Sequence, residues 1–128
     1  RKNIMKLTNE AIKNIQSALT AAGNKEMNDF GLAFKIAKNN HKLIQAAEPI
    51  AKVENDILRK YGEKDKEGVL ITQSNGKVKI VDTDRYNQDI MTLMKAESDV
   101  DLEYFGEEEI AKMHMTPNQI TLLMPVIK

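Results

Sequence analysis

Two histidines are the residues best suited to acid–base or nucleophilic chemistry in this chain, because the sequence contains no cysteine. A serine or threonine nucleophile would need one of these imidazoles as its base. His41 stands among lysines and asparagines, and His114 stands between two methionines. Neither has a serine or an acidic residue at a spacing that forms a catalytic triad by itself. We therefore expect no catalytic residue and no enzymatic activity.

The patterns that could bind a cofactor or a metal ion are incomplete. The six glycines form neither a dinucleotide-binding nor a phosphate-binding loop. Asp82 and Asp84 are spaced as in the start of a calcium loop, but Asn87 stands where that loop requires glycine and Leu93 where it requires glutamate. We interpret the two aspartates as helix N-caps, and we expect neither a metal nor a cofactor.

One set of lysines could contact phosphates. Lys35, Lys38 and Lys42 share a helical face. However, 19 basic residues are balanced by 19 acidic ones, and aromatic residues, on which bases could stack, make up only 5% of the chain. We expect a solvated helix face, and direct nucleic-acid binding is the weaker interpretation.

Acidic residues are concentrated in the second half of the chain. Ten lie between Asp82 and Glu109, where Arg85 and Lys95 are the only basic residues. Such a face can bind a basic partner or imitate the phosphates of a nucleic acid, although helix starts and a solvated surface also explain it. The candidate partner-binding acids are Asp99, Asp101, Glu103, Glu107, Glu108 and Glu109.

Apolar periodicity predicts a helical N-terminal half. One helix is expected from Thr8 to Gly23, and a longer one from about Lys25 to Tyr61. Pro49 predicts a kink or a break over residues 46–49. The apolar residues of the long helix form two adjoining stripes, which is typical of packing against several elements or against another copy. Its candidate partner-binding residues are Ile57 and Leu58.

The second half contains β signals and short helices. Residues 69–81 predict a hairpin with Asn75-Gly76 in a type I′ turn, which would place Val69, Ile71, Val78 and Ile80 on the buried face. Residues 99–105 alternate polar and apolar and are expected to join the hairpin as a third strand. A helix over about 82–96, a short helix after Gly106 and a capping box at 116–119 complete the pattern.

These elements predict an α+β fold in which a long kinked helix packs on a small antiparallel sheet and short C-terminal helices close the core. We expect a single domain over residues 1–128, with residues 1–4 as a candidate upstream remnant.

Several segments together resemble a family of small tailed-phage and prophage proteins of Gram-positive bacteria, a family without an assigned function. The segments are 5–12 (MKLTNEAI), 104–106 (YFG), 115–120 (MTPNQI) and 123–125 (LMP), together with the long helical first half. The resemblance covers most of the chain from Met5 and implies a bacteriophage context, without catalytic residues to carry over.

The expected function is that of a non-enzymatic bacteriophage protein acting through protein–protein contacts, in particle assembly or in an accessory role during infection. The alternative is an inhibitor of a host nucleic-acid enzyme with an acidic, phosphate-like surface. The expected partner is a phage or host protein or a second copy of the chain. No apolar run reaches the roughly 20 residues that span a membrane, so we expect no membrane contact and a location in the host cytoplasm or the virion.

Overall fold

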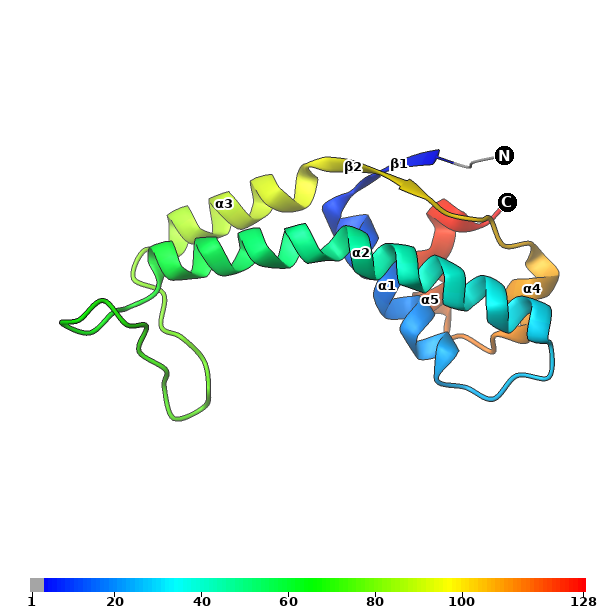
Figure 1. The fold of residues 1–128 in the computed structure, drawn as a ribbon, viewed down its shortest axis with the longest axis horizontal. Helices are drawn as coiled ribbons and strands as arrows, with labels where there is room; N and C mark the ends of the chain where they lie inside the picture. The colour runs from blue at the N-terminus through cyan, green and yellow to red at the C-terminus, as the bar shows by residue number, and fades with distance from the viewer. Residues whose placement is uncertain (1–3) are drawn as a thin grey trace. The chain divides into compact units, whose positions relative to one another are not determined.

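The computed structural model describes residues 4–128, which divide into two compact units (Figure 1). Unit 1 combines Arg1–Glu48 with Glu97–Lys128, and unit 2 is the continuous segment Pro49–Ala96. Over these residues the fold class is α+β, as the sequence predicts, with five α-helices and one two-stranded antiparallel sheet. The sequence analysis expected one domain, whereas the contacts separate unit 2 from the two segments that flank it.

The sheet belongs to unit 1 and joins segments from opposite ends of the chain. Strand β1 (Ile4–Thr8) pairs antiparallel with β2 (Glu97–Asp101), with Met5 opposite Val100. Met5, Leu7 and Val100 are buried, because alternate residues of a strand point to the same face.

The prediction of a strand over residues 99–105 was therefore wrong, both in the extent of the strand and in the strand that it pairs with. The real strand is 97–101, and it pairs with β1 instead of the hairpin. Strand β1 lies in a segment to which the sequence analysis assigned no strand, because its five residues directly precede a much stronger helical pattern.

Three helices and the last residues complete the core of unit 1. Helix α1 (Asn9–Gly23) begins where Thr8 Oγ1 accepts a hydrogen bond from the Ala11 amide at 3.1 Å. Helices α4 (Glu107–Lys112) and α5 (Pro117–Leu123) follow β2, and the predicted capping box at Thr116 is confirmed. A 3₁₀ turn, η1 (Met124–Val126), returns the chain to Phe105, whose amide donates to the Val126 carbonyl at 2.7 Å. The fully buried side chains include Ile12, Ile15, Leu19, Leu43, Leu102, Phe105, Met113, Leu123 and Val126.

The long helix α2 (Phe30–Tyr61) contributes residues to both units. It starts later than expected, because Asp29 Oδ1 accepts from the Leu32 amide at 3.0 Å and so caps the helix. The helix continues through Pro49, so the break considered for residues 46–49 is not present. Pro49 removes one backbone donor, but the residue four positions earlier, Gln45, is exposed, and water can bind its carbonyl. The division between the units falls at this proline.

Unit 2 contains the end of α2, an extended segment and α3 (Thr83–Lys95). Asp82 Oδ1 caps α3 by accepting from the Arg85 amide at 3.1 Å, which confirms its interpretation as a helix cap. The extended segment 62–81 forms isolated bridges without a continuous ladder.

The hairpin register was predicted incorrectly by one residue. Thr72 lies opposite Val78, and the Gly76 amide donates to the Gln73 carbonyl at 2.9 Å. Within the turn only Gly76 has a positive φ, at 81°, whereas a type I′ turn needs two such residues. The backbone instead forms a tight turn followed by a glycine in the left-handed region.

A one-residue shift of one strand reverses which of its side chains face inward. Val69 and Ile71 are exposed, contrary to the prediction, and Leu70 takes the inner position. The prediction was right for the other strand, because Val78 and Ile80 are half-buried. Leu70 can take this inner position because Gly62 has no side chain: a Cβ added to Gly62 would lie 2.6 Å from Leu70 Cδ2.

Candidate interaction surfaces

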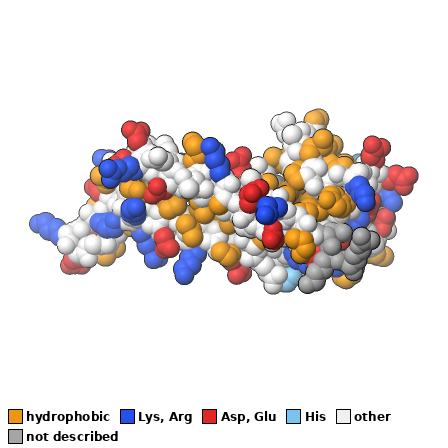
Figure 2. Space-filling view, turned by 90° about the horizontal axis from the view of Figure 1, so that it is seen from above, with side chains coloured by type: hydrophobic (Ala, Val, Ile, Leu, Met, Phe, Trp, Pro, Cys, Tyr) orange, Lys and Arg blue, Asp and Glu red, His pale blue; other side chains and the backbone are white. Residues whose placement is uncertain are grey.

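Unit 2 leaves much of its apolar surface exposed. Among its hydrophobic residues only Ile50 is buried, with 4% of its surface exposed. Five residues with large hydrophobic side chains are exposed, with exposed fractions from 38% to 71%: Val53, Val69, Ile71, Val81 and Met91. We call these five the unit 2 apolar surface. On the part of the molecule formed by unit 2, hydrophobic side chains are visible between charged ones (Figure 2).

The structure places Ile57 and Leu58, the sequence-predicted contact residues, in the interior layer of unit 2, where both are half-buried. Tyr61, one turn after Ile57, packs edge to face on Tyr86 of α3 with ring centroids 6.5 Å apart. Its hydroxyl also donates to Asp89 Oδ2 at 2.8 Å. This helical face therefore packs inside unit 2 at Ile57 and Tyr61, and of the five exposed residues only Val53, one turn before Ile57, shares it.

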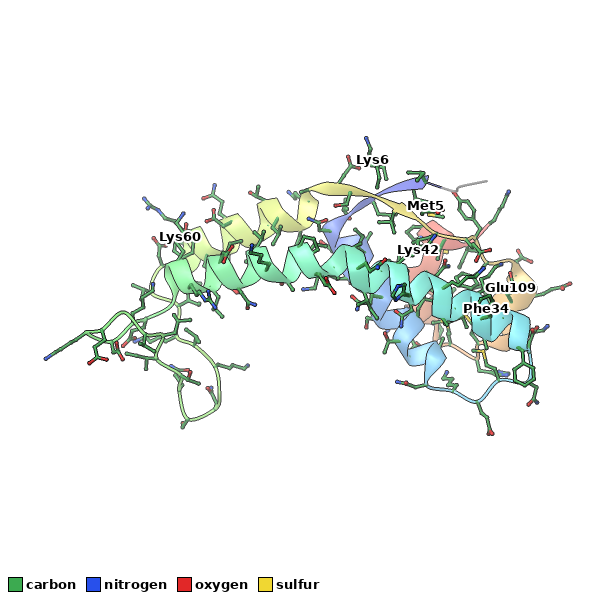
Figure 3. The ribbon with its side chains drawn as sticks, in the orientation of Figure 1. Met5, Lys6, Phe34, Lys42, Lys60 and Glu109 are labelled. Carbon is green, nitrogen blue, oxygen red and sulfur yellow. The ribbon has the colours of Figure 1, made fainter. Side chains whose placement is uncertain are left out.

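The lysines of α2 and the predicted acidic residues form one ladder of ion pairs in unit 1. Lys42 pairs with Asp101 at 2.9 Å, and Lys38 pairs with Glu103 at 3.0 Å. Lys35 pairs with Glu109 at 2.9 Å. Figure 3 labels Lys42 and Glu109, which belong to the two end rungs of this lysine–acid ladder.

The sequence analysis treated the lysines and the acids as two separate surfaces. The signal that could have joined them is a matching repeat: one turn of helix rises about 5.4 Å and two strand residues rise about 6.6 Å. Lys42 and Lys38, one turn apart, can therefore meet Asp101 and Glu103, two residues apart on an antiparallel neighbour. Glu109 lies on α4 and does not follow this repeat.

The rung at Lys35 has the most contacts. Lys35 Nζ also donates to the Tyr104 carbonyl at 2.7 Å and lies 5.3 Å from the centroid of the Phe105 ring. Glu109 Oε1 accepts from the Gly106 amide at 3.0 Å, as in a capping box. The Gly106 amide and then the Lys35 ammonium lower the pKa of the Glu109 carboxyl, while burial opposes them.

The other three candidate acids, Asp99, Glu107 and Glu108, are exposed. Among residues 4–128 no ion pair to them is present. The six predicted acids thus separate into three that are paired within unit 1 and three that face solvent.

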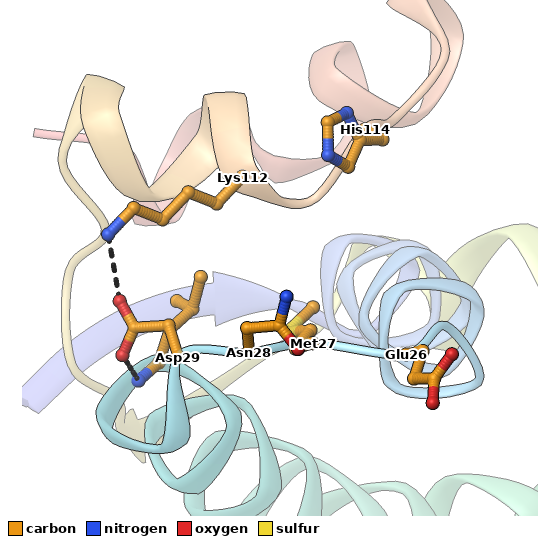
Figure 4. A pocket seen from close by; sticks show the side chains of 7 residues that line it. Glu26, Met27, Asn28, Asp29, Lys112 and His114 are labelled. Atoms are coloured by element: carbon orange, nitrogen blue, oxygen red, sulfur yellow. Dashed lines mark hydrogen bonds and ion pairs between the residues drawn. The ribbon is translucent and has the colours of Figure 1, made fainter.

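A pocket of about 380 Å³ lies beside the segment that joins α1 to α2 (Figure 4). Asp29 Oδ2 and Lys112 Nζ form an ion pair of 2.8 Å at its edge, and this contact lowers the pKa of Asp29 and raises that of Lys112. His114 also lines the pocket, in a left-handed conformation with φ of 50°. Lys25 Nζ donates to the His114 carbonyl and fixes this turn.

The two histidines are exposed and lie on different elements, His41 on α2 and His114 after α4. Within the described residues no three His, Asp or Glu side chains are grouped so that they could hold a metal ion. No helix over residues 4–128 combines the length and hydrophobicity needed to cross a membrane.

In comparisons with known proteins, the chain matches no protein-family model, no curated protein and no solved structure.

Proposed function

We propose that this chain is a non-enzymatic bacteriophage protein that acts through protein–protein contacts, in particle assembly or as an accessory factor during infection. The observation that carries the proposal is the unit 2 apolar surface. A compact unit normally encloses its own hydrophobic core, yet unit 2 buries one hydrophobic side chain and exposes five. Unit 1 also exposes large hydrophobic side chains, but it encloses a core of its own, so the small core of unit 2 is what favours a partner that covers its exposed apolar residues.

Such a contact contributes substantially to the free energy of binding. Covering a Val or Met side chain that is otherwise in water contributes about 1.5–3 kcal/mol at full burial. Val81, Val69 and Met91, with exposed fractions of 71%, 59% and 55%, would gain the most from a partner, and Ile71, with 38%, the least. The partner is a second copy of the chain or another phage or host protein, in the host cytoplasm or in the virion. The phage context itself is supported by the family resemblance of the sequence alone.

The second candidate function is an acidic inhibitor of a host nucleic-acid enzyme. Its support is limited to Asp99, Glu107 and Glu108, because lysines of α2 neutralise the other three acids. A partner bound by those residues would dissociate steeply as salt increases, since charge-driven association is screened within about 10 Å at 0.1 M ionic strength.

The test is recovery of a partner by tagged protein from infected host cells, together with the mass of the purified protein by light scattering. Val81→Lys and Met91→Lys should each reduce partner recovery, or the mass if the partner is a second copy, because a lysine cannot be buried there without a counter-charge. Ser17→Lys, the same charge added at an exposed residue of unit 1, is the matched control and should behave as wild type.

Unchanged recovery and unchanged mass in both unit 2 variants would refute the apolar contact. If a triple variant that replaces Asp99, Glu107 and Glu108 by lysine abolishes recovery while the unit 2 variants do not, the acidic inhibitor is the better description.

A further inference from the structure

Three short extended stretches of unit 2, residues 61–65, 69–73 and 77–81, pair with one another and project from the end of α2 and the start of α3 (Figure 1). The isolated bridges place Gly62 opposite Ile80, Lys64 opposite Leu70, and Thr72 opposite Val78. Each stretch uses one edge for these pairings, so each has a second, outer edge.

The stretch 69–73 is hydrogen-bonded to its two neighbours along one edge only. The amides of Ile71 and Gln73 donate to carbonyls of those neighbours at 2.9 and 2.8 Å. In an extended chain the backbone groups of alternate residues point to opposite edges, so those of Leu70 and Thr72 point outward. Within the part of the chain that the structure describes, no hydrogen bond to these outward groups is present. We call this outer side of residues 69–73 the open edge.

The open edge lacks the protection that the other two outer edges have. A strand edge with unbonded amides and carbonyls is a template for another strand, and proteins commonly block it with lysine or proline. Lys64 stands on the first stretch, and Lys77 and Lys79 stand on the third. Residues 69–73 (VLITQ) contain neither a charge nor a proline, and their valine, isoleucine and threonine favour extended structure.

The side chains beside the open edge also favour an added strand. Val69 and Ile71 stand on one face, with 59% and 38% of their surface exposed, and both belong to the unit 2 apolar surface. Leu70 and Thr72 stand on the other face, where Leu70 is half-buried. A single extended occupant would therefore bond the outward backbone groups and cover part of the apolar surface at the same time.

We propose that the open edge pairs antiparallel with the open edge of a second copy of the chain, with Ile71 facing its own equivalent on a twofold axis. This register pairs all five residues: Leu70 lies opposite Thr72 of the second copy and Val69 lies opposite Gln73 of the second copy. Leu70 and Thr72 then exchange both of their backbone hydrogen bonds, and the axis repeats the exchange.

The open edge favours a copy of itself over a foreign strand because it is complementary to itself. The register uses every outward backbone group, brings no like charges together and places two β-branched side chains opposite each other, which stabilises a strand pair. The chain as a whole has 19 basic and 19 acidic residues, so no net charge opposes association of two copies. The pairing rests on the proposed function in so far as Val69 and Ile71 need a partner, and it names that partner.

The first experiment uses the wild-type chain and needs no substitution. By light scattering, the mass should rise from one chain towards two between about 10 µM and about 1 mM, the range of contacts with a small buried area. Hydrogen exchange, measured by NMR, should slow at the amides of Leu70 and Thr72 by about fivefold when roughly four fifths of the chains are paired. The amides of Lys64 and Ile80, at the other two outer edges, are internal controls and should exchange at the same rate throughout.

The second experiment places charges on the twofold axis. Ile71→Lys and Ile71→Glu each bring like charges together and should keep the mass of one chain at every concentration. An equal mixture of the two variants should recover the mass of two chains, because opposite charges then meet. Gln88→Lys and Gln88→Glu, at an exposed residue of α3, are the matched controls and should associate as the wild type does.

Three results would overturn the pairing: a wild-type mass of one chain up to about 1 mM, a dimer in which Leu70 and Thr72 exchange as fast as in the single chain, or a mixture of folded Ile71 variants that is no heavier than either alone. If exchange at these two amides slows only when a foreign protein is added, the occupant is a partner strand and the second copy is ruled out. Should the Ile71 variants fail to fold, the wild-type exchange rates still decide.

Failure of the pairing and failure of the proposed function give different results. Val81 and Met91 lie outside the open edge, so partner recovery through those two residues still tests the proposed function if the pairing is absent. Conversely, concentration-dependent protection of Leu70 and Thr72 would support the pairing even if Val81→Lys and Met91→Lys had no effect on recovery.

Discussion

The side-chain amide of Asn39 makes hydrogen bonds to both backbone groups of Glu103. Asn39 Nδ2 donates to the Glu103 carbonyl at 2.9 Å, and Asn39 Oδ1 accepts from the Glu103 amide at 2.9 Å. Just beyond the end of β2, a buried side chain of α2 therefore provides a partner for both backbone groups of this residue. The same contact holds the residues after β2 against the helix, where the lysine–acid ladder forms.

Two adjacent asparagines should therefore respond oppositely to the same substitution. Asn39→Leu leaves both backbone groups of Glu103 without partners and should lower the free energy of unfolding by about 2 kcal/mol or more. Asn40→Leu removes an oxygen that has no partner, so stability should stay the same or rise slightly. Urea unfolding of the two variants measures the difference, and equal losses would contradict the assigned contacts.

Two glycines, Gly31 within α2 and Gly62 directly after it, should differ in the same way. At Gly62 an added Cβ would lie 2.6 Å from Leu70 Cδ2 and 2.8 Å from both Val78 Cγ1 and the Leu58 carbonyl oxygen. Gly62→Ala should therefore destabilise unit 2 by about 1–3 kcal/mol, the typical effect of overpacking. The amides of Gln73 and Val81, which are hydrogen-bonded within unit 2, should then exchange faster with deuterium.

The control is Gly31→Ala, where the nearest atom to an added Cβ is Asp29 Oδ1 at 3.4 Å. This change should leave stability unchanged or raise it by up to about 1 kcal/mol, because alanine favours a helix over glycine. Slow exchange in Gly62→Ala would mean that Leu70 and Val78 do not pack as described.

His114 has a positive φ of 50°, which glycine adopts without strain. His114→Gly should keep or slightly raise the melting temperature, and His114→Val should lower stability by about 1–2 kcal/mol, because a β-branched residue resists this conformation. The two variants are compared by thermal melting. If valine is tolerated as well as glycine, the turn does not hold that conformation in solution.

The pKa of Glu109 gives a pH dependence with a definite sign. Because its carboxyl pKa is lowered below the usual value near 4.5, folding gains stability from this group above that pH and loses it as the pH falls through the lowered pKa. Glu109→Gln should therefore have a lower melting temperature than the wild type at pH 7, and this difference in melting temperature, the gap, should shrink towards pH 3.

Glu108→Gln, at an exposed neighbouring acid outside the ladder, should show no comparable gap at pH 7. A gap for Glu109→Gln that is constant over this pH range would show that the ionised carboxylate contributes nothing to its contacts with Gly106 and Lys35.

The sequence predicted the features that a few neighbouring residues determine. The caps at Asp82 and Thr116 and the α+β class follow from local hydrogen-bonding chemistry and apolar periodicity, and the structure confirms them. Contacts between distant segments were not accessible in this way. Nothing near Met5 indicates that Val100 is its strand partner, and nothing near Lys38 indicates that Glu103 neutralises it.

The hairpin shows a different reason for failure. Asn75-Gly76 fits two turns that differ by one residue in register, and the choice depends on packing elsewhere. Gly62 leaves room for Leu70, which selects the register that exposes Val69 and Ile71. The candidate contact surface of unit 2 was missed for the same reason, since those two residues had been assigned to the interior.

The pairing of β1 with β2 also sets an order of events during synthesis at the ribosome. The partner of Met5 is Val100, so the sheet of unit 1 cannot close until β2, about 90 residues after β1, has been translated. Unit 2 is one uninterrupted segment and is complete before β2 emerges. Strand β1 and the apolar face of helix α1 must therefore wait until β2 has been translated, and long-range pairings of this kind fold slowly. A ribosome that stalls before β2 would hold a nascent chain whose first helix is exposed to chaperones.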